Sequence, residues 1–155
     1  MPTVTAGKLL DRCCEFEIRQ EGYYAGIRDR SKDNSVRLLT YYLALHRRHR
    51  EQALAAHGKL QVASLRKMKI KQAAAFEPGE WFRLFDTPPE QVGGVELLQA
   101  AGGYYQALLD LYRFMREQVL SDENRDVLES LIGAEERDVA MVKQMTAMHY
   151  FSRSG

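Results

Sequence analysis

The chain has 155 residues, of which 45% are hydrophobic, and this length allows one buried core without disulfide or metal support. The 22 lysines and arginines nearly balance the 21 aspartates and glutamates, so no overall charge favours binding to nucleic acid or to an anionic membrane. The start of the sequence lacks a signal-peptide pattern, and no window approaches the roughly 18 apolar residues of a membrane-spanning helix. We expect one cytoplasmic domain over residues 1–155.

The first two predicted helices cover residues 6–29 and 34–57. Thr5 is a suitable N-cap for the first, and the polar segment 31–35 forms a turn before the second. Apolar or small residues recur at steps of three and four along both segments, which indicates a core-facing stripe on each helix. The stripes are Leu9, Cys13, Phe16, Tyr23 and Ile27, and then Leu38, Tyr42, Leu45, His49 and Ala53.

The two cysteines, Cys13 and Cys14, are neighbours in the sequence. Adjacent cysteines rarely bridge because the required geometry is strained, and the chain has no other thiol. We expect both to be reduced core residues.

Residues 59–93 have a different pattern and predict a long crossover. Its first part either extends the second helix or forms its own helix, with the basic side chains Lys59, Arg66, Lys67, Lys69 and Lys71 in solvent. Further along lies the densest aromatic cluster of the chain, Trp81, Phe82, Leu84 and Phe85. We expect this cluster to form a lid over the bundle with Trp81 as its largest anchor. A partner-binding role for the cluster is the alternative.

Two further helices are predicted over residues 95–119 and 122–150, with residues 121–124 as a cap for the second. Their stripes are Leu98, Ala101, Tyr105, Leu108, Tyr112, Met115 and Val119, and then Leu128, Leu131, Glu135, Asp138, Val142 and Met145. Short turns make each helix pair an antiparallel hairpin. Two such hairpins predict an all-α, antiparallel four-helix bundle without strands.

Several enzyme signatures are absent, including the P-loop, the dinucleotide-binding glycine pattern, the nucleophile elbow and C-x-x-C. Gly102 and Gly103 fall inside a predicted helix and indicate close packing or a kink, with a small-molecule pocket beside them as an alternative. The remaining chemistry belongs to ionisable groups on the core stripes, Glu17, His46, His49, Glu135 and Asp138.

Helix pairs joined by a long crossover, with inward carboxylates and histidines, resemble the ferritin-like superfamily, and Glu17 followed by Tyr24 is similar to its rubrerythrin-type members. Members of this family hold two irons with a Glu on each of two helices and E-x-x-H on each of the other two. The resemblance implies a ferritin-like bundle that binds metal, with oxidoreductase activity as one outcome.

The resemblance also assigns ligand positions. Glu17 matches the glutamate of the first helix, and the sequence from His46 to His49 takes the place of the first E-x-x-H. The sequence from Glu135 to Asp138 falls at the second E-x-x-H, with aspartate in place of histidine. Tyr112 matches a tyrosine position of the family, which puts Tyr105 where the family has its other glutamate.

Three of the six positions therefore keep the family's residue type. We predict that any bound metal is a single iron, manganese or zinc ion held by Glu17, His46, His49 and Glu135. Tyr105 and Asp138 are less suited, because a tyrosine must lose its proton and an aspartate is shorter than the histidine that it replaces. Protonation of the histidines should release the ion below about pH 6.

Other interpretations stay open at this point. The bundle could be free of metal, with a buried network of histidine, tyrosine and carboxylate groups in a structural or interaction protein. Glu21 competes with Glu17 for the inward position, and His46 could lie at the surface among arginines. Tyr105 is expected in the core with its hydroxyl on a carboxylate. Met141, Met145 and Met148 are expected to fill gaps in the core. The abundant aromatic residues favour a homodimer.

Overall fold

The computed structural model describes residues 3–71, 76–118 and 121–154, and the side chains as far as residue 148. This part of the chain is mostly helical, as predicted. Its helices are α1 (Ala6–Arg30), α2 (Asn34–Leu43), α3 (His46–Ala55), α4 (Lys59–Lys67), α5 (Gly94–Arg116) and α6 (Asp122–Ser154). Two short strands, β1 (Thr3–Thr5) and β2 (Lys69–Lys71), and two 3₁₀ helices, η1 (Pro78–Glu80) and η2 (Pro89–Gln91), complete the described elements.

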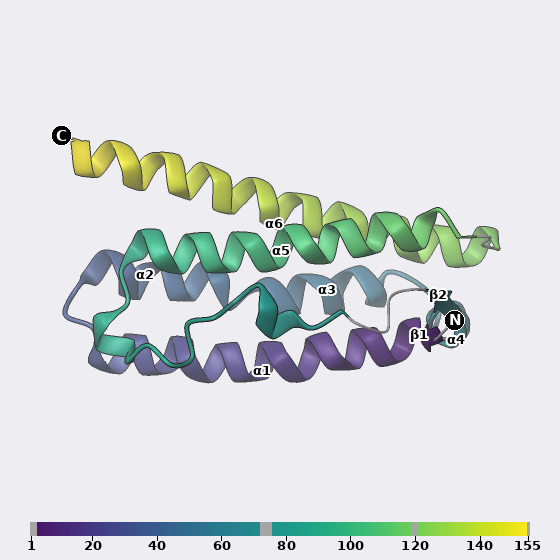
Figure 1. The fold of residues 1–155 in the computed structure, drawn as a ribbon. Coiled ribbons are helices and arrows are strands. Elements are labelled where there is room, and N and C mark those ends of the chain that lie inside the picture. Colours follow the sequence, from purple (N-terminus) through teal and green to yellow (C-terminus); the bar gives the residue numbers. More distant parts are fainter. Residues whose placement is uncertain (1–2, 72–75, 119–120, 155) are drawn as a thin grey trace.

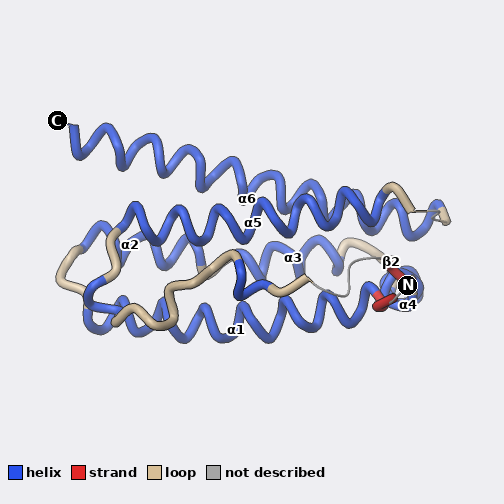
Figure 2. The backbone as a smooth tube through the Cα atoms, viewed as in Figure 1, coloured by secondary structure: helices blue, strands red, loops and turns tan. Residues whose placement is uncertain are grey.

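The long helices lie along one another in two antiparallel pairs (Figure 1). The helix α1 runs in one direction and the α2–α3 segment returns beside it, whereas α5 and α6 form the second pair. Contacts of α6 with α3 and α4, and of α2 with α5, join the two pairs. The core lies between these helices. The crossover, which joins α4 to α5 in the sequence, runs along the outside of the molecule (Figure 2).

The local signals that begin the helices act as predicted. The hydroxyl oxygen of Thr5 accepts a hydrogen bond from the amide of Lys8, at 3.2 Å, and Ser121 caps α6 by accepting from the amide of Asn124, at 3.1 Å. The predicted stripes of α5 and α6 are buried in the described residues, apart from the half-buried Met145, while Val119 lies outside them. None of the described helices is long and apolar enough to cross a membrane.

The second helix differs from its prediction in two ways. It ends at Leu43 and restarts at His46, with a turn at Ala44 and Leu45 between the two parts. The predicted stripe was also wrong, because Leu38, Tyr42 and Leu45 are exposed. The buried residues of α2 and α3 are instead Val36, Leu39, Thr40, Leu43, His46 and Arg50. Both sets recur at steps of three and four, so spacing alone does not distinguish the two faces.

A small antiparallel sheet corrects the prediction that strands are absent. Thr3 pairs with Lys71, Val4 with Ile70 and Thr5 with Lys69. Val4 and Ile70 are buried, and the pair of strands ties the start of the chain to the segment that follows α4. Of the two alternatives for the start of the crossover, the structure shows a separate helix, α4. Its basic side chains are exposed as expected at Lys59, Lys67, Lys69 and Lys71, whereas Arg66 is only half-exposed.

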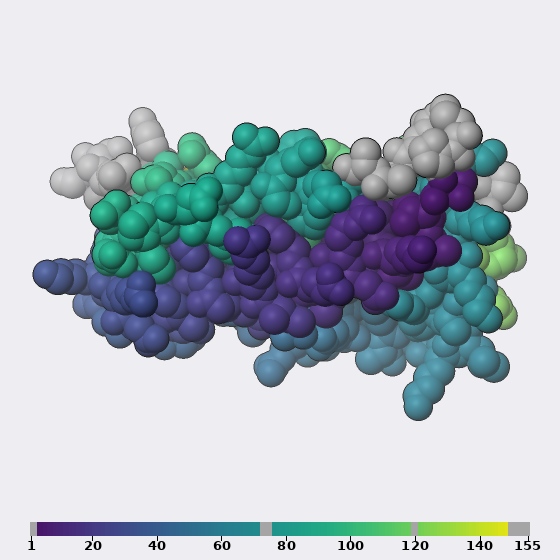
Figure 3. Space-filling view, turned by 60° about the horizontal axis from the view of Figure 1, so that its bottom comes forward, coloured from purple at the N-terminus to yellow at the C-terminus, as the bar shows by residue number. Residues whose placement is uncertain are grey.

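The prediction for Trp81 was also wrong, because this side chain is 48% exposed and the neighbouring Phe82 is only 1% exposed. Phe82 makes aromatic contacts with Phe16 and Tyr24 of α1 and with Phe85 of the crossover. The crossover contacts α1 through η1 and η2, and the two lie side by side on the face seen in Figure 3. Its anchor is therefore the smaller ring that points inward.

Candidate metal centre

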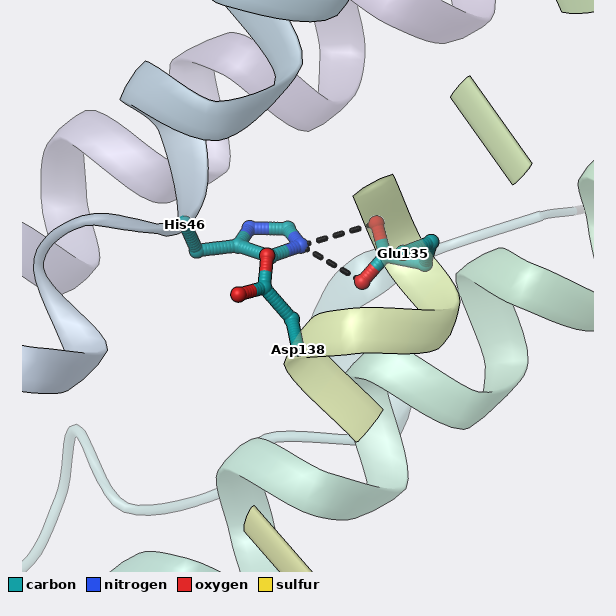
Figure 4. A group of neighbouring side chains, drawn as sticks. All are labelled: His46, Glu135 and Asp138. Carbon is teal, nitrogen blue, oxygen red and sulfur yellow. Dashed lines mark hydrogen bonds and ion pairs between the residues drawn. The ribbon is translucent and has the colours of Figure 1, made fainter. Parts of the chain in front are cut away.

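The ionisable residues of the core stripes meet where α1, α3, α5 and α6 come together. Glu17 comes from α1, His46 from the first turn of α3, and Glu135 and Asp138 from successive turns of α6. All four are buried. Since residues three apart in a helix share a face, α6 presents the carboxylates of Glu135 and Asp138 to His46, as Figure 4 shows.

His46 lies at the centre of this cluster, between two carboxylates. Its Nδ1 lies 3.0 Å from Oε1 of Glu17, and its Nε2 lies 2.9 and 2.7 Å from the two oxygens of Glu135. The imidazole also stacks on the ring of Tyr105, with centroids 4.1 Å apart and planes 11° apart. A histidine held on both nitrogens and on one face has a fixed orientation.

Glu17 is bound on its other side by Arg50. The guanidinium of Arg50 donates to both carboxylate oxygens, at 2.7 and 2.8 Å, and the hydroxyl of Tyr104 donates to Oε2 at 2.5 Å. A bidentate pair of this kind is among the stronger charge-assisted hydrogen bonds. Glu17 is therefore fully hydrogen-bonded, whereas Glu21, the alternative inward residue, is only half-buried and pairs with Arg47.

Burial and charge act in opposite directions on these groups. Burial raises the pKa of Glu17, but the charges of His46 and Arg50 and their hydrogen bonds outweigh it and lower that pKa to about 2. Burial lowers the pKa of His46, but Glu135 and Glu17 raise it to about 10. Burial raises the pKa of Glu135. In the absence of a metal, His46 is therefore an imidazolium that donates to both carboxylates.

His49 extends the cluster toward solvent. Its Nδ1 lies 2.8 Å from Oδ1 of the buried Asp138, and its side chain is 34% exposed. Asp138 and His49 line a cleft of about 680 Å³ between α3 and α6, together with Gln52, Ala53, Ala56, Glu129, Ser130, Gly133, Arg137 and Met141. The cleft connects the buried Asp138 to solvent.

The structure brings His46, Glu135 and Asp138 together, with one ligand atom from each within 4.8 Å of the others. Two residues of the predicted set, Glu17 and Glu135, contact different nitrogens of His46: Glu17 contacts Nδ1, and Glu135 contacts Nε2. A metal ion binds only one nitrogen of an imidazole. In this arrangement, an ion on His46 can therefore have Glu17 or Glu135 as a further ligand, but not both. Asp138, which the sequence ranked below Glu17, takes the position beside His46 and Glu135.

Two residues of the cluster, Arg50 and Tyr104, were missed by the sequence analysis. Arg50 follows His46 by four residues and so shares its helical face, which is a signal that could have been used. The sequence predicted that the hydroxyl of Tyr105 binds a carboxylate, but it is the hydroxyl of the preceding residue, Tyr104, that donates to Glu17. The hydroxyl of Tyr105 donates to the carbonyl of Leu43 at 3.2 Å.

Met141 and Met145 pack against the core as expected, but Met148 is 62% exposed. Cys13 is buried and Cys14 is half-buried, and both are free thiols. Burial, with the charge of Glu17, raises the pKa of Cys13 to about 12. This thiol is therefore protonated and does not compete as a ligand at neutral pH.

The charges of the cluster fit one divalent cation. Arg50 neutralises Glu17, which leaves two negative charges on Glu135 and Asp138. Neutral His46 and His49 would supply nitrogen donors, and two imidazoles with two carboxylates are a common set for zinc, iron(II) and manganese(II).

Comparison of the chain with known protein families, with curated proteins and with solved structures finds no match to any of them.

Proposed function

We propose that this protein is a ferritin-like helical bundle that binds one divalent metal ion between α3 and α6. The ligands would be Nε2 of His46 and the carboxylates of Glu135 and Asp138, with His49 as the fourth. The observation that carries the proposal is the convergence of buried donor atoms from His46, Glu135 and Asp138, two of them carboxylates. Asp138 and the partly exposed His49 also line a cleft that gives access to solvent.

The role of Glu17 in this proposal is to orient a ligand. A carboxylate on Nδ1 of a metal-binding histidine fixes the ring and directs the lone pair of Nε2 toward the metal, and such partners typically matter tenfold or more for affinity. Glu17 lies 3.0 Å from that nitrogen and is itself held by Arg50. The same pairing argues for one ion, because Arg50 already balances the charge of Glu17.

The experiment measures metal content after the protein is dialysed against iron(II), manganese(II) or zinc. We expect one ion per chain, and we expect Asp138→Asn to weaken binding by at least about tenfold because it removes an anionic ligand. The control is Glu51→Gln, which neutralises an exposed carboxylate on α3. Two ions per chain, or equal binding by the Asp138 variant, would contradict the proposed site.

A metal-free bundle with a structural or interaction role is the second candidate. It is favoured by the position of His46, whose two nitrogens already contact Glu17 and Glu135. A metal ion must displace the proton from an imidazole whose pKa is about 10, so affinity should rise with pH throughout the neutral range. Natively folded protein that binds none of the three metals at about pH 8 would support this candidate over the first.

A further inference from the structure

A second cavity lies on the other side of α5 from His46 and shares no residue with the cleft beside Asp138. It is a groove of about 550 Å³ between α5 and the crossover. Its lining residues are Phe76 and Trp81 from the crossover and Gly103, Gln106, Ala107, Asp110, Leu111 and Phe114 from α5. Pockets of roughly 300–1,000 Å³ hold small organic molecules.

The shape of the groove follows from the sequence of α5. Residues 103, 106, 107, 110, 111 and 114 are spaced so that they share one face of the helix. Gly103 has no side chain and Ala107 has a short one, so little side-chain volume fills the middle of this face. A Cβ at Gly103 would lie 3.6 Å from the carbonyl oxygen of Trp81, so the crossover backbone approaches α5 closely at this point.

The walls of the groove are aromatic. Trp81 is 48% exposed, and Phe76 and Phe114 are half-buried. Arg12 donates to the carbonyl of Phe76 at 2.9 Å and holds that end of the crossover in place. The faces of aromatic rings carry negative potential, so rings that surround a pocket favour a positively charged ligand.

The groove also carries a carboxylate, that of Asp110. Among the described residues that line it, Asp110 is the single ionisable one and none is basic. One oxygen of Asp110 accepts a hydrogen bond from the amide of Gln106 at 2.9 Å, and no ion pair to Asp110 occurs among the described residues. The nearby Arg113 of α5 is paired with Glu136 instead.

From these features we propose that the groove between α5 and the crossover binds a small organic cation with an apolar body, such as an aralkyl ammonium compound. The apolar part would contact Trp81, Phe76 and Phe114, and the ammonium group would lie near Asp110. This site is independent of the proposed metal centre. It also assigns a role to the exposed indole of Trp81, which the crossover does not use as an anchor.

Trp81 is the only tryptophan of the chain, so its fluorescence reports on the groove. The probes are benzyltrimethylammonium, benzyl alcohol and phenylacetate, which share one ring and differ in charge. We expect the cation to change the fluorescence of Trp81 and to bind about tenfold more tightly than the alcohol, a difference of about 1.4 kcal/mol. Phenylacetate should bind more weakly still.

Two variants test the assignment. Asp110→Asn keeps the shape of the side chain and should remove the preference for the cation, whereas Asp126→Asn, an exposed aspartate of α6, should keep it. Gly103→Leu should fill the groove and abolish the response to all three probes. Equal affinity for the three probes, no response to the cation, or an unchanged preference in Asp110→Asn would overturn the proposal.

Discussion

At the scale of single residues, the central feature is a chain of buried charges that runs from Arg50 through Glu17 and His46 to Glu135. Each member satisfies a hydrogen-bonding group of the next. Buried ion pairs add little stability compared with apolar residues of the same size, but the loss of one partner leaves a charge without compensation. The network therefore fixes the positions of its members more than it stabilises the fold.

This view predicts a large effect for Arg50. Replacing Arg50 with Met should lower the free energy of unfolding by about 3–5 kcal/mol, because the buried Glu17 loses a bidentate cationic partner and His46 alone remains beside both Glu17 and Glu135. The matched control on the same helix is Arg47→Met, which removes a half-exposed pair with Glu21 and should cost less than about 1 kcal/mol. Urea denaturation in the presence of a chelator measures both. Equal costs for the two variants would show that Glu17 does not depend on Arg50.

The raised pKa of His46 predicts a pH dependence of stability. The group binds its proton more tightly in the folded chain, with a pKa of about 10, than at its ordinary value of 6.5. The stabilisation is therefore complete below about pH 6.5 and is lost as the pH rises through about 10. Urea denaturation of metal-free protein over this range should show it.

Two variants separate His46 from other groups that titrate in the same range. His46→Gln should remove most of this pH dependence, whereas His57→Gln should keep it, since within the described part of the chain His57 contacts the hydroxyl of Ser130 and forms no ion pair with a carboxylate. A slope that persists unchanged in His46→Gln would assign it to another group.

At the scale of elements, α2 and α3 show how two possible core faces compete. The face with Leu38, Tyr42 and Leu45 is exposed, whereas the buried face joins the apolar residues of α2 to the polar His46 and Arg50 of α3. Burying His46 and Arg50 is possible because Glu17 and Glu135 are aligned with them on α1 and α6. Partners on other helices therefore decided which side of this segment faces inward.

The crossover gives a second test at this scale. Phe82 is 1% exposed and packs against rings of α1, so Phe82→Ala should lower the free energy of unfolding by about 3–5 kcal/mol. Trp81→Ala should cost about 1 kcal/mol or less, because half of the indole is already in solvent. Thermal or urea denaturation compares the two directly. A larger cost for Trp81 would restore it as the anchor.

At the scale of the whole molecule, self-association remains a prediction, and the structure suggests where to test it. Leu38, Tyr41, Tyr42 and Leu45 are exposed together on α2 and the turn that follows it. Contiguous apolar side chains on a surface are typical of interaction sites. If a homodimer forms through this face, a charged substitution there should disrupt it.

We expect sedimentation at high micromolar concentration to give a dimer, and Leu38→Glu combined with Tyr42→Glu to give a monomer. The control is Leu60→Glu, at an 87% exposed position on α4 near the opposite end of the molecule (Figure 1). A wild-type chain that sediments only as a monomer would contradict the prediction. A dimer that tolerates the double substitution would place the interface elsewhere.

The sequence by itself determined the helical class, the points at which α1 and α6 begin, after Thr5 and Ser121, and the buried stripes of α5 and α6. These depend on local capping and on spacing along one helix, which a single segment contains. The sequence also identified His46, Glu135 and Asp138 as inward candidates. Only the tertiary structure decided that Arg50 and Tyr104 satisfy Glu17, that Glu17 and Glu135 contact opposite nitrogens of His46, and that Trp81 is exposed. The physical reason is that the cost of burying a polar group depends on partners from distant helices, and periodicity within one helix carries no information about them.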